Sequence, residues 1–181
     1  MIPDLTRNYF ELFALPEAYR IDGARLADAY RRLQSQLHPD RFASASDRER
    51  LLSVQSAAQV NQAYATLKDD VARARYLLEL RGVEFNEERD TATDPEFLMD
   101  QMELRERLAE VTDKDDPYAA LDEVLNDIAR RRAALVEGYE ARLEAGDLAA
   151  ARDLVIKMRF YERLQRETDR LAERLDDEQL S

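Results

Sequence analysis

The stretch Leu37-His38-Pro39-Asp40-Arg41-Phe42 lies between two segments that have the apolar spacing of α-helices. Its proline cannot continue a helix and disfavours helical geometry in the preceding residue, so the first helix is predicted to end at about Leu37. The second helix begins after a serine cap, Ser44 or Ser46, and extends beyond Leu51 and Val54. The stretch is therefore predicted to be the stiff loop of an antiparallel helical hairpin.

Short helices flank this hairpin on both sides. Apolar spacing predicts a helical turn from Tyr9 to Ala14 and a helix from Val71 to Leu80, which stops near Gly82. Two long helices with a small helix at each end predict a compact helical domain over residues 1–81.

The remainder of the chain predicts a second helical domain. Residues 82–94 are polar and acidic, lack periodicity and are expected to be a linker. In residues 95–181, the cap-and-proline pairs Asp94-Pro95 and Asp116-Pro117 each open a helix, and Gly146 separates the last two helices. Three helices joined by short turns predict an up-down-up bundle. The predicted fold class is all-α, with an N-terminal helical domain followed by a three-helix bundle.

Composition excludes several classes of function. The chain of 181 residues is 45% hydrophobic, with only 4 glycines and 5 prolines, which is typical of a helical globular protein. It has no cysteine and one histidine, so no disulfide, no metal site and no cofactor are expected. We see neither an apolar run of the roughly 20 residues that span a bilayer nor a signal peptide, and we expect a cytoplasmic protein.

The negative charge is concentrated in one segment. The net charge is −12, and residues 84–127 hold sixteen acidic and four basic side chains, which accounts for the whole imbalance. This charge argues against nucleic acid or an anionic membrane as the main partner. One interpretation is an acidic face kept for solubility, and the other is a binding surface.

The predicted helix that begins at Pro95 has apolar residues on two sides. The side expected to be buried consists of Phe97, Gln101, Leu104, Leu108 and Val111. The opposite side consists of Met99, Met102, Glu103, Glu106 and Glu110, with Leu98 at its edge. Methionines rimmed by carboxylates favour a docking site, and Phe160 on the last helix is expected to join it. The alternative is that another helix covers this side and makes it core.

The single histidine is open to several interpretations. His38 could act as a general base, but no nucleophile motif or phosphate-binding loop accompanies it. As a metal ligand it has no second histidine or cysteine. Asp40 could accept a bidentate arginine from another protein, or both residues could simply cap helix ends. Positive charge near the loop comes from Arg25, Arg31, Arg32 and Arg41.

Four blocks of the first half together resemble the J-domain family, co-chaperones of DnaK-type ATPases. They are Tyr9-Phe10-Glu11-Leu12-Phe13, Leu37-His38-Pro39-Asp40-Arg41-Phe42, Val60-Asn61-Gln62-Ala63-Tyr64-Ala65-Thr66-Leu67 and Arg73-Ala74-Arg75-Tyr76-Leu77-Leu78. The second half is similar to the C-terminal domain of the HscB family, J-type co-chaperones of iron–sulfur cluster assembly. That similarity is carried by Phe97-Leu98-Met99-Asp100-Gln101-Met102-Glu103-Leu104-Arg105-Glu106 and Lys157-Met158-Arg159-Phe160.

The resemblance implies two partners and no catalytic residue. It implies that a DnaK-like (HscA-type) chaperone ATPase binds His38, Pro39 and Asp40, assisted by Arg25, Arg31, Arg32 and Arg41. It implies that an iron–sulfur scaffold protein (IscU type) binds Leu98, Met99, Met102, Glu103, Glu106, Glu110 and Phe160. The expected function is delivery of the scaffold to the chaperone and stimulation of its ATPase.

Three alternatives remain open at this point. The protein could be a general J-domain co-chaperone that delivers unfolded clients, an enzyme that uses His38, or a purely structural helical protein. The sequence also departs from the family pattern: Arg41 stands where lysine is usual, and Asp69-Asp70-Val71 lacks the proline common at the start of the fourth helix.

Overall fold

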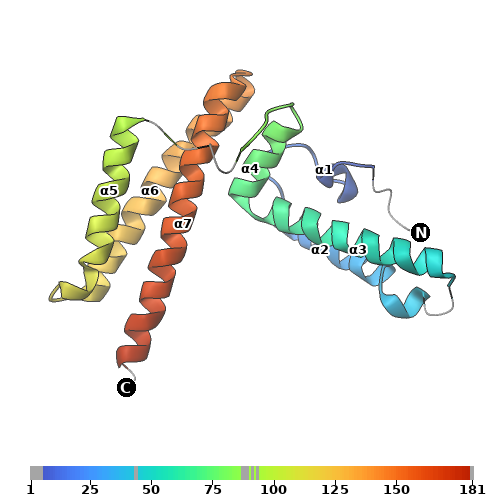
Figure 1. Ribbon diagram of the computed structural model, residues 1–181, viewed down its shortest axis with the longest axis horizontal. Helices are drawn as coiled ribbons and strands as arrows, with labels where there is room; N and C mark the ends of the chain where they lie inside the picture. Colours follow the sequence, from blue (N-terminus) through green and yellow to red (C-terminus); the bar gives the residue numbers. More distant parts are fainter. Residues whose placement is uncertain (1–5, 43–44, 87–89, 91, 93, 180–181) are drawn as a thin grey trace. The chain divides into compact units, whose positions relative to one another are not determined.

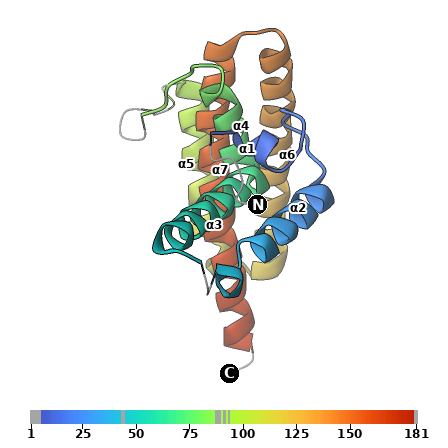
Figure 2. The same ribbon diagram turned by 90° about the vertical axis from the view of Figure 1, so that its right-hand side faces the viewer.

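The computed structural model describes residues 6–42, 45–86, 90, 92 and 94–179, and its regular elements in these residues are all helices. The chain divides into two compact units, residues 1–81 and 82–181. The ribbon in Figures 1 and 2 follows α1 to α4 through the first unit and α5 to α7 through the second. The all-α prediction is confirmed.

The first unit is built on a pair of helices, α2 (Gly23–Gln36) and α3 (Asp47–Lys68). Two shorter helices, α1 (Tyr9–Leu12) and α4 (Asp70–Glu79), pack against α3. The rings of Tyr30 on α2 and Tyr64 on α3 stack with centroids 4.0 Å apart. The Tyr30 hydroxyl donates to Asn61 Oδ1 at 3.0 Å. Stacking and hydrogen bonding across the pair hold the two helices in a fixed register around the loop that joins them.

The helices of this unit begin and end where capping residues or backbone dihedral angles near their ends require it. As predicted, α2 ends at Gln36, with Leu37 as its C-cap. Ser46 caps α3 in a capping box with Glu49, whereas Ser44 lies outside the described residues. The first helix was predicted to reach Ala14 but ends at Leu12, because Ala14 has a φ of 53°, which no residue within a right-handed helix adopts.

The second unit contains α5 (Pro95–Ala109), α6 (Pro117–Glu144) and α7 (Leu148–Gln179), with a 3₁₀ turn, η2 (Val111–Asp113), after α5. Asp94 and Asp116 cap α5 and α6 as predicted, each followed by proline at the first helical position. The longer helices α6 and α7 pair along most of their length, and α5 packs against both (Figure 1). The core shared by the three helices includes Phe97, Leu104, Val111, Leu121, Ile128, Tyr161 and Leu164.

The start of the second unit is attached to α7. The guanidinium of Arg152 on α7 donates to the carbonyl oxygen of Glu84 at 3.1 Å, pairs with Asp90 and lies over the ring of Phe85. Lys157 Nζ lies 2.6 Å from Asp94 Oδ2. The segment that the sequence marks as polar and irregular is therefore tied to the bundle at several of its described residues. None of the described helices has the length and apolar character needed to cross a membrane.

Candidate functional site

The loop after α2 presents two polar side chains to solvent. Leu37 is buried and anchors the loop, and Pro39–Phe42 form a single 3₁₀ turn, η1, which packs against α3. The backbone N–H of Arg41 donates to the carbonyl oxygen of His38 at 3.0 Å and closes the turn. The side chain of Asp40 is 91% exposed and that of His38 60% exposed, with 3.5 Å between His38 Nδ1 and Asp40 Oδ2. The turn is fixed by its backbone, so the Asp40 carboxylate remains accessible to a partner.

The four arginines expected near the loop are all exposed. Arg25 and Arg32 are two turns apart on one side of α2, and Arg41 lies in η1 itself. Arg31 pairs with Asp28, three residues earlier on α2. This pairing reduces the positive charge on α2, and Arg25 lies in the first turn of α2, at the end away from the loop, so the basic surface beside the loop is modest. In the described part of the chain, no cluster of three or more histidine, aspartate or glutamate side chains is arranged to hold a metal ion.

Helix α5 has one buried and one exposed apolar side, as predicted. Phe97 and Leu104 on α5, and Val111 in the following turn η2, are at most 6% exposed, whereas Met99 and Met102 are each 72% exposed. Leu98, at the edge of the exposed side, is 41% exposed. Glu103, Glu106 and Glu110 are also exposed on this side. The alternative that another helix covers these methionines is wrong, and we call this surface the α5 face: Leu98, Met99, Met102, Glu103, Glu106 and Glu110.

Phe160 was expected to join the exposed surface, and the structure places it in the core instead. Its side chain is 3% exposed, in edge-to-face contact with Phe97 and Tyr161 at centroid distances of 5.7 and 5.2 Å. Met158, on the other side of α7, is also buried, because α7 packs against both α5 and α6. Phe160 therefore packs against the buried side of α5, through Phe97. A substitution at Phe160 would disturb packing before it could report on contact with a partner.

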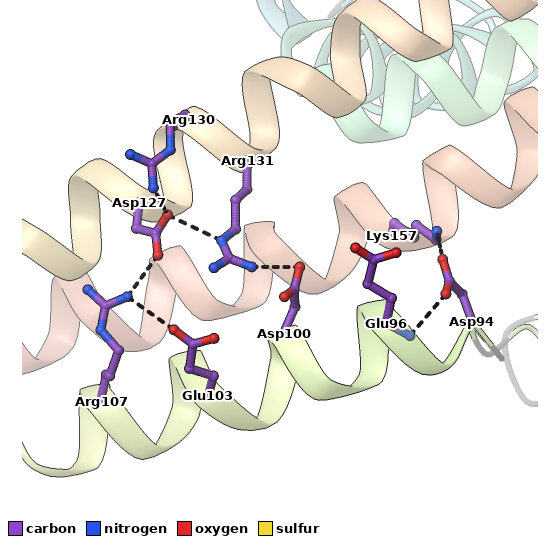
Figure 3. Close-up of polar contacts among 9 residues, drawn as sticks. All are labelled: Asp94, Glu96, Asp100, Glu103, Arg107, Asp127, Arg130, Arg131 and Lys157. Carbon is purple, nitrogen blue, oxygen red and sulfur yellow. Dashed lines mark hydrogen bonds and ion pairs between the residues drawn. The ribbon is translucent and has the colours of Figure 1, made fainter.

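A charged network joins α5 to α6 beside the α5 face (Figure 3). The side chain of Asp127 on α6 is only 7% exposed and accepts hydrogen bonds from Arg107 on α5 at 2.8 Å and from Arg131 at 3.2 Å. Arg130 also pairs with Asp127. Arg131 reaches Asp100 on α5 at 2.6 Å. Two ion pairs between the helices, Arg107–Asp127 and Asp100–Arg131, therefore fix the rotation of α5 and keep its methionines outward.

Glu103 lies where this network meets the α5 face. Its Oε1 is 3.9 Å from Arg107 Nη1, and its side chain is 57% exposed. At this distance and exposure the pair contributes little, so Glu103 can turn to a cation on a partner at small cost. Sequence reasoning missed the network: the spacing of Asp127, Arg130 and Arg131 signals contacts within one helix, but not the contacts to α5.

Comparisons with known proteins identify the family to which this chain belongs. A family profile described as the HSCB C-terminal oligomerisation domain matches residues 93–169. A curated relative from Aeromonas salmonicida, named co-chaperone protein HscB homolog, is 45% identical over 168 residues, covering 93% of this chain and 98% of the relative. This chain belongs to the HscB family of co-chaperones.

Solved structures of the HscB family have the same fold. Chaperone HscB from Vibrio cholerae is 44% identical, with a TM-score of 0.86 over 93% of this chain and 99% of that one. Human co-chaperone protein HscB is 32% identical, with a TM-score of 0.84 over 93% of this chain and 84% of that one. The predicted family, and the predicted fold of a J-domain followed by a C-terminal helical domain, are confirmed.

Within the HscB-family bundle, Asp127 is the most enclosed ionised group of the network. Burial alone would raise the pKa of Asp127, but hydrogen bonds from Arg131 and Arg107 outweigh it and hold the pKa below its usual value. The hydrogen bond from Lys157 similarly lowers the pKa of Asp94 at the start of α5. Both carboxylates are therefore charged at neutral pH and hold α5 in place in that form.

We expect Asp127→Asn to lower the free energy of unfolding by about 2 kcal/mol at pH 7, because Arg107 on α5 and Arg131 on α6 lose the anion that they share. The folded-state pKa is lowered, so the stabilisation is complete above the usual value of 3.8 and is lost as pH falls through the folded value. Urea unfolding followed by circular dichroism at pH 7 and at pH 3 measures both effects.

Asp122→Asn is the matched control, because Asp122 is an exposed carboxylate on the same helix. It should change stability by less than about 0.5 kcal/mol. An equal loss in the two variants, or a difference from the parent protein that grows as pH falls, would contradict the role given to the network.

Proposed function

We propose that this protein is an adaptor in iron–sulfur protein maturation. Its C-terminal bundle binds an iron–sulfur scaffold protein of the IscU type, and its J-domain brings the scaffold to a DnaK-like, HscA-type chaperone and stimulates ATP hydrolysis by that chaperone. The observation that carries the proposal is the α5 face, where Met99 and Met102 are exposed on a helix whose opposite side is core. Membership of the HscB family supports the same assignment.

The chemistry of the α5 face specifies the partner surface it fits. Methionine side chains are unbranched and adaptable, so Met99 and Met102 can pack into a shallow apolar surface. The surrounding carboxylates of Glu103, Glu106 and Glu110 favour a partner with basic side chains at the rim of that surface. A scaffold protein with an apolar patch bordered by lysine or arginine meets both conditions, whereas an unfolded chain offers no fixed basic rim.

The loop suits a different kind of contact. An exposed carboxylate in a turn that is already closed loses little conformational entropy on binding. Asp40 can therefore accept a paired hydrogen bond from an arginine of the chaperone. His38 lies beside that carboxylate, and Pro39 is the first residue of the turn that carries it. The positive charges of Arg25, Arg31, Arg32 and Arg41 attract an acidic surface on the chaperone.

The reconstituted ATPase reaction tests the proposal. Steady-state hydrolysis by the cognate chaperone is measured alone, with this protein, with the scaffold, and with both. We expect each addition to stimulate modestly and the two together to stimulate more than the sum, because the adaptor raises the effective concentration of scaffold at the chaperone.

Two outcomes would contradict the proposal. Absence of any stimulation would exclude the co-chaperone role. Replacement of the scaffold by an unfolded polypeptide with no loss of combined stimulation would instead favour a general co-chaperone.

A further inference from the structure

In the first half of α3, apolar side chains are exposed and polar side chains are buried. Leu51 and Val54 are 59% and 63% exposed and Leu52 is 36% exposed, whereas Ser53 and Ser56 on the opposite side are at most 4% exposed. We call Leu51, Leu52 and Val54 the α3 patch. The extension of α3 through Leu51 and Val54 was predicted, but the sequence did not indicate that these residues face solvent.

This orientation is fixed by the rest of the helix. Ser53, Ser56, Val60, Ala63 and Leu67 form one buried stripe at helical spacing, and the last three are completely buried. The two serines are satisfied locally, since Ser53 Oγ donates to the Arg50 carbonyl and Ser56 Oγ donates to the Leu52 carbonyl, each at 2.8 Å. Rotating α3 to bury the patch would expose Val60 and Leu67, so the patch stays in solvent in the free protein.

The α3 patch lies at the end of α3 that the loop leads into. The turn η1 (Pro39–Phe42) packs against α3 and lies beside its first turns in Figure 1. Since α3 begins at Asp47, Leu51 and Val54 lie only about 6 and 10 Å along the axis from its start. The apolar side chains and the exposed His38 and Asp40 therefore belong to the same end of the helix pair.

Three of the four charged side chains in the first turn of α3 contact close neighbours, and the fourth, Arg48, is exposed. In the first turns of α3, Arg50 pairs with Asp47, and the Glu49 carboxylate accepts from the Ser46 backbone and hydroxyl at 3.0 and 2.7 Å. These contacts leave the side chains of Leu51, Leu52 and Val54 as an apolar surface with one exposed cation, Arg48, beside it. An apolar partner group fits it better than a charged one.

The area of the patch limits its occupant. A stable interface buries roughly 800 Å² on each partner, which three side chains cannot supply, so the patch alone would not hold a second copy of this chain. Surface ion pairs contribute at most about 1 kcal/mol each, so the polar loop is also weak by itself. Interfaces combine an apolar centre with a polar rim. The patch and the loop together have that composition.

We propose that the α3 patch is the apolar part of the chaperone-binding surface, and that it packs against an apolar segment of the DnaK-like chaperone while Asp40 engages a basic side chain of the same protein. This inference rests on the proposed function of the loop. In this proposal, the α3 patch provides most of the affinity for the chaperone, and the loop stimulates ATP hydrolysis by the chaperone.

Substitution of both residues to a polar helix former tests the assignment. Leu51→Gln with Val54→Gln, made in the full chain, should leave helicity and the thermal midpoint unchanged because both side chains are exposed. We expect the concentration for half-maximal ATPase stimulation to rise at least about tenfold, with the maximal stimulation retained at saturation. Leu80→Gln, an exposed leucine at the end of α4, is the control and should leave both values unchanged.

Asp40→Asn, measured in the same assay, separates the two proposals. If Asp40→Asn loses stimulation while the Leu51/Val54 variant stimulates at the concentrations of the parent protein, the α3 assignment is overturned and the loop assignment stands. If both variants stimulate the ATPase as the parent protein does, the α3 assignment and the loop assignment are both wrong. A concentration-dependent dimer in sedimentation, abolished by the Leu51/Val54 change with no effect on stimulation, would assign the patch to a second copy and overturn the proposal.

Discussion

Asp40→Asn should reduce the maximal stimulation of the chaperone ATPase at least about thirtyfold, because loss of the Asp40 charge leaves the basic side chain of the chaperone unpaired in the complex, which costs about 2–5 kcal/mol. The substitution keeps the shape of the side chain and removes only its charge. The Asp40 side chain is 91% exposed, and the turn is closed by the backbone bond from Arg41 to His38, so folding should be unaffected. Steady-state ATP hydrolysis, together with circular dichroism of the variant, measures the effect.

Asp28→Asn is the matched control for charge. It removes one negative charge from exposed α2, where Asp28 pairs with Arg31, and it leaves the loop intact. We expect stimulation to be retained or slightly increased, because the basic surface becomes more positive. An equal loss in both variants would mean that net charge, and not the position of the Asp40 carboxylate, controls the interaction. Scaffold affinity should be unchanged in either variant.

The parts of the fold that were predictable from sequence are those set by local chemistry. Proline at 39 ends α2, and the pairs Asp94-Pro95 and Asp116-Pro117 open α5 and α6, because capping and the missing proline N–H act within a few residues. The α5 face was also predictable, since α5 packs on one side only and its helical periodicity separates core from surface.

The misses share a physical cause. Phe160 and Met158 lie on different sides of α7 and are both buried, because α7 is covered by two helices and a single-sided wheel does not apply to it. On α3, two serines occupy buried positions that an apolar pattern cannot mark. Asp127 finds partners on a helix about twenty residues away in sequence, which depends on how α5 and α6 meet. Each miss depends on contacts between elements.

Met99→Ala with Met102→Ala should weaken binding of the scaffold at least about thirtyfold, because two flexible apolar side chains that would be buried in the complex are removed. Both methionines are 72% exposed, and alanine is the best helix former, so the bundle should keep its helicity and its thermal midpoint. Titration calorimetry with the cognate scaffold measures the affinity, and ATPase stimulation in the absence of scaffold should be unaffected.

The Leu51→Gln/Val54→Gln protein is the matched control for this variant. It also removes two exposed apolar side chains, but from the first unit, and it should bind the scaffold with the affinity of the parent protein. Equal loss of scaffold affinity in the two proteins would indicate that exposed apolar area in general, and not the α5 face in particular, binds the scaffold. A drop in helicity of the methionine variant would mean that Met99 and Met102 contribute to the core. Unchanged affinity in a folded variant would remove the α5 face from the scaffold interface altogether, and with it the observation on which the adaptor proposal depends.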